Sequence, residues 1–225
     1  MIIRKEQVDE GASIARFAAD LLLKTRSDQS GRSGSDLRRA CGDIQAHAES
    51  YIGNNQIGAK LRACFDQARV AGATFNQFNR IGWTIHEQAA VSLLAVLLKQ
   101  GCVCFSLQQM SLVLITMTFT SREDVDNVRL MVGEAFDAAE EVAADEMALQ
   151  VYRKLVALHA AVTFHLCATA KPLPQMLQYQ FAAPRPTLVL SYRLYDSAIR
   201  ADQIRDENKI IHPAFAPRLG RALSF

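Results

Sequence analysis

The sequence predicts a mainly α-helical protein, with a helical body over residues 1–170 and a small α+β module over residues 171–225. Before Lys171, apolar residues recur every three to four positions in successive segments, which is typical of helices with one buried side. The segment Lys171-Pro172-Leu173-Pro174 cannot continue a helix and is the best candidate for a domain boundary. Beyond it, two strand-like segments flank two short helical ones, which gives the order strand–helix–helix–strand.

The first three helices of the body are separated by residues that favour turns. We expect a helix over residues 5–26, a polar loop over 27–34, a second helix capped by Ser35, and a third helix over 56–71. Gly53-Asn54-Asn55 ends the second helix and Gly72 ends the third, because glycine and asparagine tolerate the left-handed backbone conformation.

The middle of the chain is its most apolar part. A long helical stretch is expected over residues 74–100, bent near Gly82 and ended by Gly101. A further helix is expected over 102–119, although residues 113–120 also have high strand propensity. Lys99, Gln100 and Gln108 interrupt the apolar run before it reaches the roughly 20 residues of a membrane span, so buried helices are predicted and a span is the alternative.

The clearest helix signal begins at Ser121, a helix cap that is followed by Glu123 and Asp124 in the first turn. From Arg122 to Thr169 only Gly133 interrupts the sequence, and a single helix of that length would extend about 70 Å at about 1.5 Å per residue. This rod either bends at residues 138–144 or reaches other subunits; the sequence favours the second possibility.

The C-terminal module begins with a predicted strand over residues 176–181. Pro186 and Thr187 then open a short apolar helix or strand over 188–195, and Asp196 or Ser197 caps a second helix that ends at Asn208. Two X-Pro pairs keep residues 212–217 extended, and Gly220 turns the chain into a final strand over 221–225.

Composition excludes several classes of protein. Half of the 225 residues are hydrophobic and the net charge is +2, which suits a packed core and gives no electrostatic case for nucleic acid or an anionic membrane. The first residues are too charged for a secretory signal. Five cysteines, an odd number at irregular spacing, indicate reduced thiols rather than a disulfide framework.

Motifs for catalysis or metal binding are weak. His86-Glu87 lacks the second histidine that a zinc-protease helix needs, since position 90 is alanine. Cys102 and Cys104 are too close for a zinc knuckle, and His159 and His165 lie on different faces of a helix. We therefore expect no enzyme activity, no cofactor and no metal.

A family resemblance rests on the C-terminal residues. Tyr195-Asp196, Arg200-Ala201-Asp202, Asn208, His212-Pro213-Ala214-Phe215 and Gly220 resemble the C-terminal end of Mu-like phage tail proteins, known as DNA circularisation proteins. The same segment is similar to a LysM-like β-α-α-β module of contractile-phage baseplates, including the hub–wedge connector. The resemblance covers about a fifth of the chain. Asp196 follows Tyr195 directly, where the family has an intervening glycine, and the large N-terminal β domain of longer members has no counterpart.

The resemblance implies a structural component of a contractile tail baseplate, made in the host cytoplasm and located in the virion. Its partners would be hub, tube or wedge proteins and further copies in a ring, with no nucleic acid and no membrane span. The implied partner-binding residues are Tyr195, Asp196, Arg200, Arg205, Asn208, His212 and Phe215. Arg200 and Arg205 are expected to face a partner's acids, so changing both to glutamate should block incorporation and leave the fold intact. The alternatives are a module that binds cell-wall glycan and a DNA-end-binding protein; the low net charge argues against the latter.

Overall fold

A computed structural model describes residues 4–25, 31–146 and 148–224 and shows a mainly helical chain, as predicted. The described residues form two compact units: one up to Met117 together with Leu130–Thr163, and one of Thr118–Arg129 with the residues after Thr163. The predicted boundary at residue 171 falls inside the second unit, because two long helices each contribute residues to both units.

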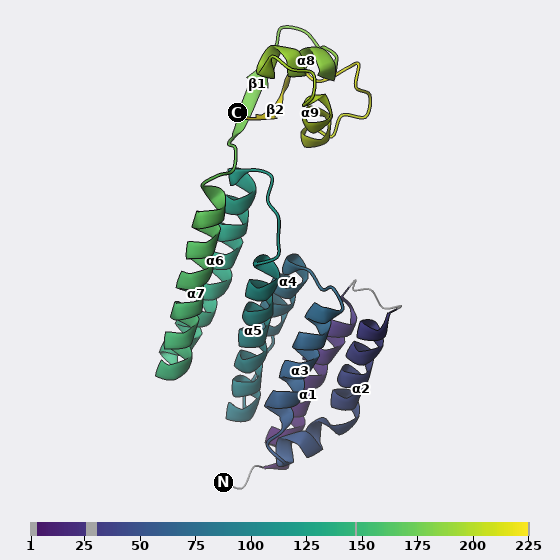
Figure 1. The fold of residues 1–225 in the computed structure, drawn as a ribbon. Helices are drawn as coiled ribbons and strands as arrows, with labels where there is room; N and C mark the ends of the chain where they lie inside the picture. Colours follow the sequence, from purple (N-terminus) through teal and green to yellow (C-terminus); the bar gives the residue numbers. More distant parts are fainter. Residues whose placement is uncertain (1–3, 26–30, 147, 225) are drawn as a thin grey trace. The chain divides into compact units, whose positions relative to one another are not determined.

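The first three helices are α1 (Lys5–Leu23), α2 (Arg32–Gly53) and α3 (Ile57–Val70), which pack against one another (Figure 1). The predicted stops are confirmed: Asn55 has φ 54° and Gly72 has φ 90°, both in the left-handed region that ends helices. Helix α2 begins three residues before the predicted cap Ser35, and residues 27–30 of the predicted loop lie outside the described residues.

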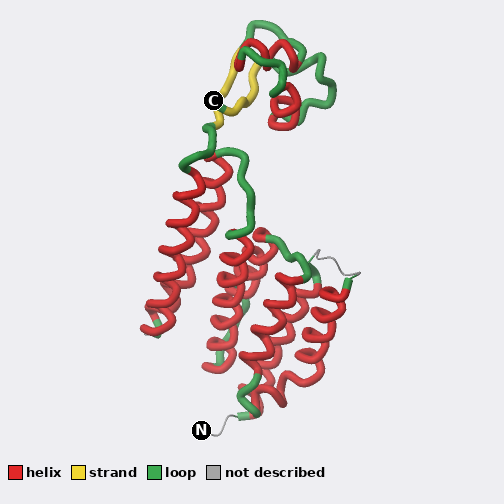
Figure 2. Tube along the Cα trace, viewed as in Figure 1, coloured by secondary structure: helices red, strands yellow, loops and turns green. Residues whose placement is uncertain are grey.

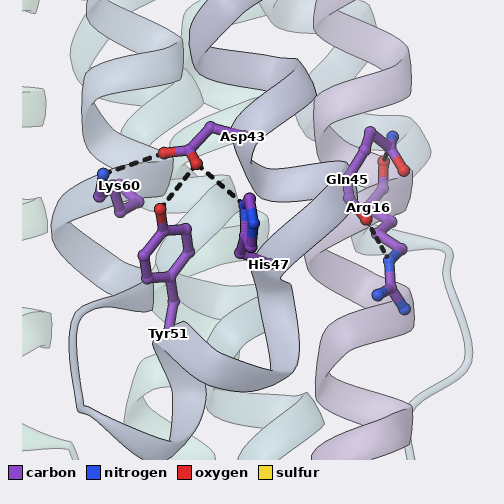
Figure 3. A network of polar contacts seen from close by, with 6 residues as sticks. All are labelled: Arg16, Asp43, Gln45, His47, Tyr51 and Lys60. Atoms are coloured by element: carbon purple, nitrogen blue, oxygen red, sulfur yellow. Dashed lines mark hydrogen bonds and ion pairs between the residues drawn. The ribbon is translucent and has the colours of Figure 1, made fainter.

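A polar network ties α2 to α3 (Figure 3). The Asp43 carboxylate accepts hydrogen bonds from Tyr51 Oη at 2.7 Å and from Lys60 Nζ at 2.9 Å, and His47 Nδ1 lies 3.2 Å away. The Tyr51 hydroxyl and then the Lys60 ammonium lower the pKa of Asp43. His47 itself has non-helical backbone angles, φ −128° and ψ 19°, so the network spans a kink in α2.

Helices α4 (Phe75–His86) and α5 (Leu93–Leu114) correct two predictions. The predicted helix over 74–100 is wrong because the chain leaves the helix after His86, and Gly101 does not break a helix because it lies inside α5. A residue far away in the sequence fixes the chain between α4 and α5. The Glu10 carboxylate of α1 accepts hydrogen bonds from the backbone N–H groups of Val91 (2.7 Å) and Ser92 (2.9 Å). A carboxylate at the amides just before α5 binds donors at a helix start, where negative charge is favourable.

Replacing Glu10 with glutamine is therefore expected to lower stability, and the loss should depend on pH. Hydrogen bonds from Ser92 and Val91 hold the pKa of Glu10 below its usual value. A lowered folded-state pKa stabilises the fold above the unfolded-state pKa, and the contribution is lost as pH falls through the folded-state value. Urea midpoints of the two proteins should differ at neutral pH and converge in acid. Equal midpoints at neutral pH would show that the contact contributes nothing.

Helix α5 is long and apolar enough to cross a membrane by length and composition, with a mean hydropathy of 1.3 over its most apolar window. In the structure α5 packs against α4, α1 and α3. The core helix of a helical bundle satisfies the same test, so this property alone does not distinguish the two environments.

The predicted single rod is wrong: it is two helices, α6 (Arg122–Asp145) and α7 (Leu149–Ala170), which turn back on each other (Figures 1 and 2). The start is as predicted, since Ser121 Oγ accepts from the Asp124 N–H and the Asp124 carboxylate accepts from the Ser121 N–H. The reversal lies just after residues 138–144, where a bend was the less favoured alternative. The Ala148 N–H bonds to the Ala143 carbonyl at 3.0 Å and closes the end of α6.

The C-terminal segments form a two-stranded antiparallel sheet with two helices between the strands (Figure 2). Strand β1 (Met176–Gln180) pairs with β2 (Leu219–Leu223), with Met176 opposite Leu223 and Gln180 opposite Leu219. Between them lie α8 (Thr187–Tyr195) and α9 (Ala201–Glu207). The order strand–helix–helix–strand is confirmed. Strand β2 lies earlier than the predicted 221–225, and Phe225 is outside the described residues.

Candidate functional site

The predicted partner-binding residues all lie on the C-terminal module, around one small core. That core consists of buried residues that come mainly from both strands and both helices: Tyr179, Leu190, Tyr195, Ile204, Ala216 and Ala222. Phe181, Leu194 and Ile210 are partly buried and pack against it. Such a small core leaves most side chains of the module in contact with solvent. The position of each predicted residue therefore decides whether it holds the module together or remains available to a partner.

Tyr195 and Arg200 are structural. Tyr195 is buried, and its hydroxyl donates a hydrogen bond to the Leu223 carbonyl of β2 at 2.7 Å. The Arg200 guanidinium lies over the Tyr195 ring, 4.7 Å from its centroid, and donates to the Ser224 carbonyl at 3.3 Å. Burial raises the pKa of Tyr195, and the hydrogen bond with Arg200 opposes this shift. The pair connects the end of α8 to the end of β2.

Asn208 joins α9 to β2 through its side-chain amide. Its Nδ2 donates to the carbonyls of Ile204 and Arg221, each at 2.8 Å, and its Oδ1 accepts from the Arg221 N–H at 2.7 Å. Asn208 ends α9 as predicted, but Lys209 is the residue in the left-handed conformation, with φ 50°. Asparagine stands at this position because its amide can donate and accept at once.

Asp196 and Arg205 also make contacts within the module. Asp196 has φ 55° and ends α8, with its N–H bonded to the Tyr192 carbonyl at 2.8 Å. It does not cap α9, which begins after Arg200. Arg205 forms ion pairs with Asp202 at 3.0 Å and Asp206 at 3.2 Å, so its charge is largely balanced by its own helix.

His212 and Phe215 occupy an exposed loop. The Phe215 N–H bonds to the His212 carbonyl at 3.0 Å, and the two rings lie 5.4 Å apart. Phe215 is 73% exposed and its neighbour Ile211 is 99% exposed. The loop is fixed against the start of α8, because the Thr187 N–H bonds to the Pro213 carbonyl at 2.7 Å.

Sequence reasoning missed several exposed apolar residues of the module, among them Leu188, Tyr192 and Ile211. Leu188 and Tyr192 of α8 are 59% and 61% exposed, and together with Ile211 and Phe215 they form what we term the apolar residues of the module. Leu188 and Tyr192 are four positions apart, so they share one side of α8. No local sequence signal separates them from Leu190, which is buried, except this spacing on a short helix.

One group of side chains in the described part of the chain could hold a metal ion. Asp137 and Glu140 of α6 and His159 of α7 each offer a ligand atom, and these atoms lie within 4.8 Å of one another. His159 Nδ1 lies 3.1 Å from Glu140 Oε1, and its ring stacks on Phe136 at 5.0 Å between centroids. The contact with Glu140 and the stacking on Phe136 account for the position of His159 without a metal.

The cysteines differ widely in exposure. Cys41, Cys64 and Cys102 are buried, Cys104 is half-buried and Cys167 is exposed. Burial raises the pKa of Cys102 to about 12, and a hydrogen bond to Cys41 together with burial raises the pKa of Cys64. Because the thiolate is the reactive form, these two thiols should react slowly.

We expect a thiol reagent to label Cys167 first in the native protein. Cys102 should react only after denaturation, since it must become exposed and lose its proton. Mass spectrometry of peptides after timed labelling measures each site, and the Cys167→Ser variant is the control. Rapid labelling of Cys102 in the native state would contradict the packing of α5.

Two cavities of the first unit are too small for a substrate, and a third, open hollow of ≈ 580 Å³ is lined by Lys24, Gln77 and Arg80 among others. One, of ≈ 20 Å³, is lined by Phe78, Asn79 and Met110 among others, and the second, of ≈ 40 Å³, by Val103, Val142 and Leu155 among others. Ligand sites usually measure about 300 Å³ or more. The two small cavities are therefore below the size of a ligand site, whereas the hollow beside Gln77 and Arg80 is not.

No family model matches the chain, and no curated protein matches it.

Proposed function

We propose that the chain is a structural component of a contractile phage tail baseplate, which docks hub or tube to wedge proteins through its C-terminal module. The observation that carries the proposal is that some residues of the resemblance hold the module together while others are exposed. Tyr195, Arg200 and Asn208 make internal bonds between helices and strands, while Phe215 is exposed. A module that different proteins share keeps the residues that hold its fold together. A docking surface presents exposed apolar residues.

The module is, on this proposal, LysM-like. Its two helices lie in sequence between two antiparallel strands that pair with each other, which agrees with the β-α-α-β order of the resemblance. Gly220 fits the same pattern, because a side chain there would overlap with the Tyr179 hydroxyl and Asn208 Oδ1.

The partners proposed are hub, tube and wedge proteins and further copies arranged in a ring, in the virion. The apolar residues of the module would fill a hydrophobic recess of the neighbour, since large buried side chains supply most of the energy of such contacts. Exposed cations of the module, among them Arg193, Lys209 and Arg218, would set its orientation on the partner. The role is mechanical, with no enzyme activity, nucleic acid, cofactor or membrane span.

The Arg200→Glu, Arg205→Glu change is a poor test of docking, because Arg200 packs on Tyr195 and bonds to Ser224. Phe215→Asp is a better one, since Phe215 is exposed and its substitution leaves the module's core untouched.

Cosedimentation with purified peptidoglycan tests the proposal against glycan binding. We expect the full chain to remain in the supernatant and antibodies against it to label the baseplate end of purified tails. Saturable binding to peptidoglycan, lost in Phe215→Asp and Tyr192→Asp, together with unlabelled tails, would replace the proposal with a cell-wall-binding function.

A further inference from the structure

The hairpin of α6 and α7 brings three potential metal ligands together. Asp137 and Glu140 are three positions apart on α6, so they lie on the same side of that helix, and His159 faces them from α7. Their ligand atoms all lie within 4.8 Å of one another. His159 Nδ1 is 3.1 Å from Glu140 Oε1 and 4.0 Å from Asp137 Oδ1. One imidazole nitrogen and two carboxylates therefore converge on one point.

Hydrogen bonds among the three residues do not satisfy all of them. His159 Nδ1 carries at most one proton, so it donates to one carboxylate at a time, and Glu140 is the nearer acceptor. No lysine or arginine of the described residues forms an ion pair with Asp137 or Glu140. The side chains of His159 and Glu140 are only 24% and 17% exposed, so water screens this charge incompletely. The group therefore has more negative charge than its own residues balance.

The kinds of ligand atom indicate which ion fits. Imidazole nitrogen together with carboxylate oxygen is a common zinc ligand set, whereas Ca²⁺ and Mg²⁺ prefer oxygen ligands alone. In a tetrahedral zinc site with bonds of about 2.0–2.2 Å, neighbouring ligand atoms lie about 3.4 Å apart. The 3.1 Å between His159 Nδ1 and Glu140 Oε1 is already close to this value. The Asp137 side chain is 74% exposed and is therefore free to shorten its 4.0 Å distance.

His159 is held in place before an ion arrives. Its ring stacks on Phe136 with 5.0 Å between centroids and 17° between planes, so the ring cannot turn freely and Nδ1 stays directed at α6. Glu140 is held by its contact with the same nitrogen. Ligands that are already in position lose less conformational entropy when they bind.

We infer that the α6–α7 hairpin binds one zinc ion through Asp137, Glu140 and His159 Nδ1, with a water molecule as fourth ligand. The ion takes the place of a proton on Nδ1, which is released to solvent, and it balances both carboxylates at once. Its role is structural, because it joins residues of two helices that are 19 positions apart in the case of Glu140 and His159. The inference follows from the hairpin alone and does not rest on the proposed function.

The sequence could not indicate this site. The expectation of no metal came from motifs with ligands close together in the sequence, such as Cys102 with Cys104. In the single rod that the sequence favoured, Glu140 and His159 would lie about 28 Å apart at about 1.5 Å per residue. The reversal between α6 and α7 is what brings them together.

The first experiment is calorimetric titration of the full chain with zinc chloride, in a Cys167→Ser background because Cys167 is an exposed thiol. We expect one ion per chain, and a loss of affinity of about tenfold or more in His159→Gln and in Glu140→Gln. Glu141→Gln is the matched control, since it removes the same charge from the next residue, and it should bind zinc like the background. Circular dichroism checks that each variant keeps its helix content. Absence of binding in the background, or equal affinity in all variants, overturns the proposal.

The second experiment uses stability and a spectroscopic probe. Zinc should raise the thermal midpoint of the background protein and not that of His159→Gln, because an ion that binds the folded hairpin stabilises it. Asp137→Asn should reduce the increase. Co²⁺ bound in place of zinc should give visible d–d absorption without the near-ultraviolet band of a thiolate ligand. An equal increase in His159→Gln, or a thiolate band, would assign the ion to other residues and overturn the proposal.

Discussion

The Gly220→Ala variant is expected to lose the folded C-terminal module. A Cβ at this position would lie closer than real contacts allow to the Tyr179 hydroxyl and to Asn208 Oδ1, the atom that accepts the Arg221 N–H. Neither neighbour can move freely, because Tyr179 belongs to the small core and Asn208 links α9 to β2. Overpacking of this kind costs about 1–3 kcal/mol, which is a large part of what so small a core supplies.

Hydrogen exchange measures this loss locally, since amides of β1, β2 and α9 should lose protection while those of α1–α3 keep it. The matched control is Gly42→Ala in α2, where a Cβ meets nothing within 4 Å. That change should stabilise by about 0.5–1 kcal/mol, because alanine in a helix loses less entropy on folding than glycine. A protected β2 in Gly220→Ala would show that the contacts around Tyr179 are looser than described.

Replacing Phe136 with alanine is expected to destabilise the α6–α7 hairpin by about 3–5 kcal/mol, the usual cost of deleting a buried phenylalanine. Phe136 is fully buried, and its ring stacks on His159 at 5.0 Å and an angle of 17°. Its loss leaves a cavity and also removes the surface that positions His159 beside Glu140. Thermal unfolding and hydrogen exchange of α7 measure the effect.

Phe215→Ala is the control for this change, since it deletes the same side chain at a position that is 73% exposed. Its effect on stability should stay within about 0.5 kcal/mol. Equal destabilisation by the two variants would mean that α6 and α7 do not pack as a hairpin through Phe136.

Signals contained in a few neighbouring residues predicted the structure well. The Ser121–Asp124 cap, the left-handed Asn55 and Gly72, and the strand that begins at Met176 all appear where the sequence places them. Each of these depends on backbone conformation or hydrogen bonds within three or four residues, so the sequence alone is sufficient.

Contacts between distant residues could not be predicted in this way. The chain leaves the helix after His86 without a glycine or proline, and its re-entry at α5 depends on Glu10, 81 residues before Val91. The reversal between α6 and α7 likewise lacks a breaker residue and is fixed by packing between Phe136 and His159. Gly101 is tolerated inside α5 because a glycine costs a helix only about 1 kcal/mol.

In the candidate site, too, some residues could be predicted from local sequence signals and others could not. Tyr195 and Asn208 could be identified from the sequence because they belong to a motif, and both form hydrogen bonds to β2. Ile211 and Leu188 have no motif, because exposure is a property of the folded module rather than of the residue. The motif therefore identifies the fold of the module, whereas the folded surface shows which side chains are available to a partner.

Incorporation into tail particles is the measurement that tests the central claim most directly. Cells that assemble tails and lack the wild-type gene would be supplied with the wild type or with Ile211→Asp and Phe215→Asp combined, and the chain would be quantified in purified tails by mass spectrometry. We predict a constant number of wild-type copies per tail and loss of the variant from tails while it remains folded in the lysate. Tails that contain no wild-type chain, or that contain the variant at the wild-type level, would contradict docking through the C-terminal module.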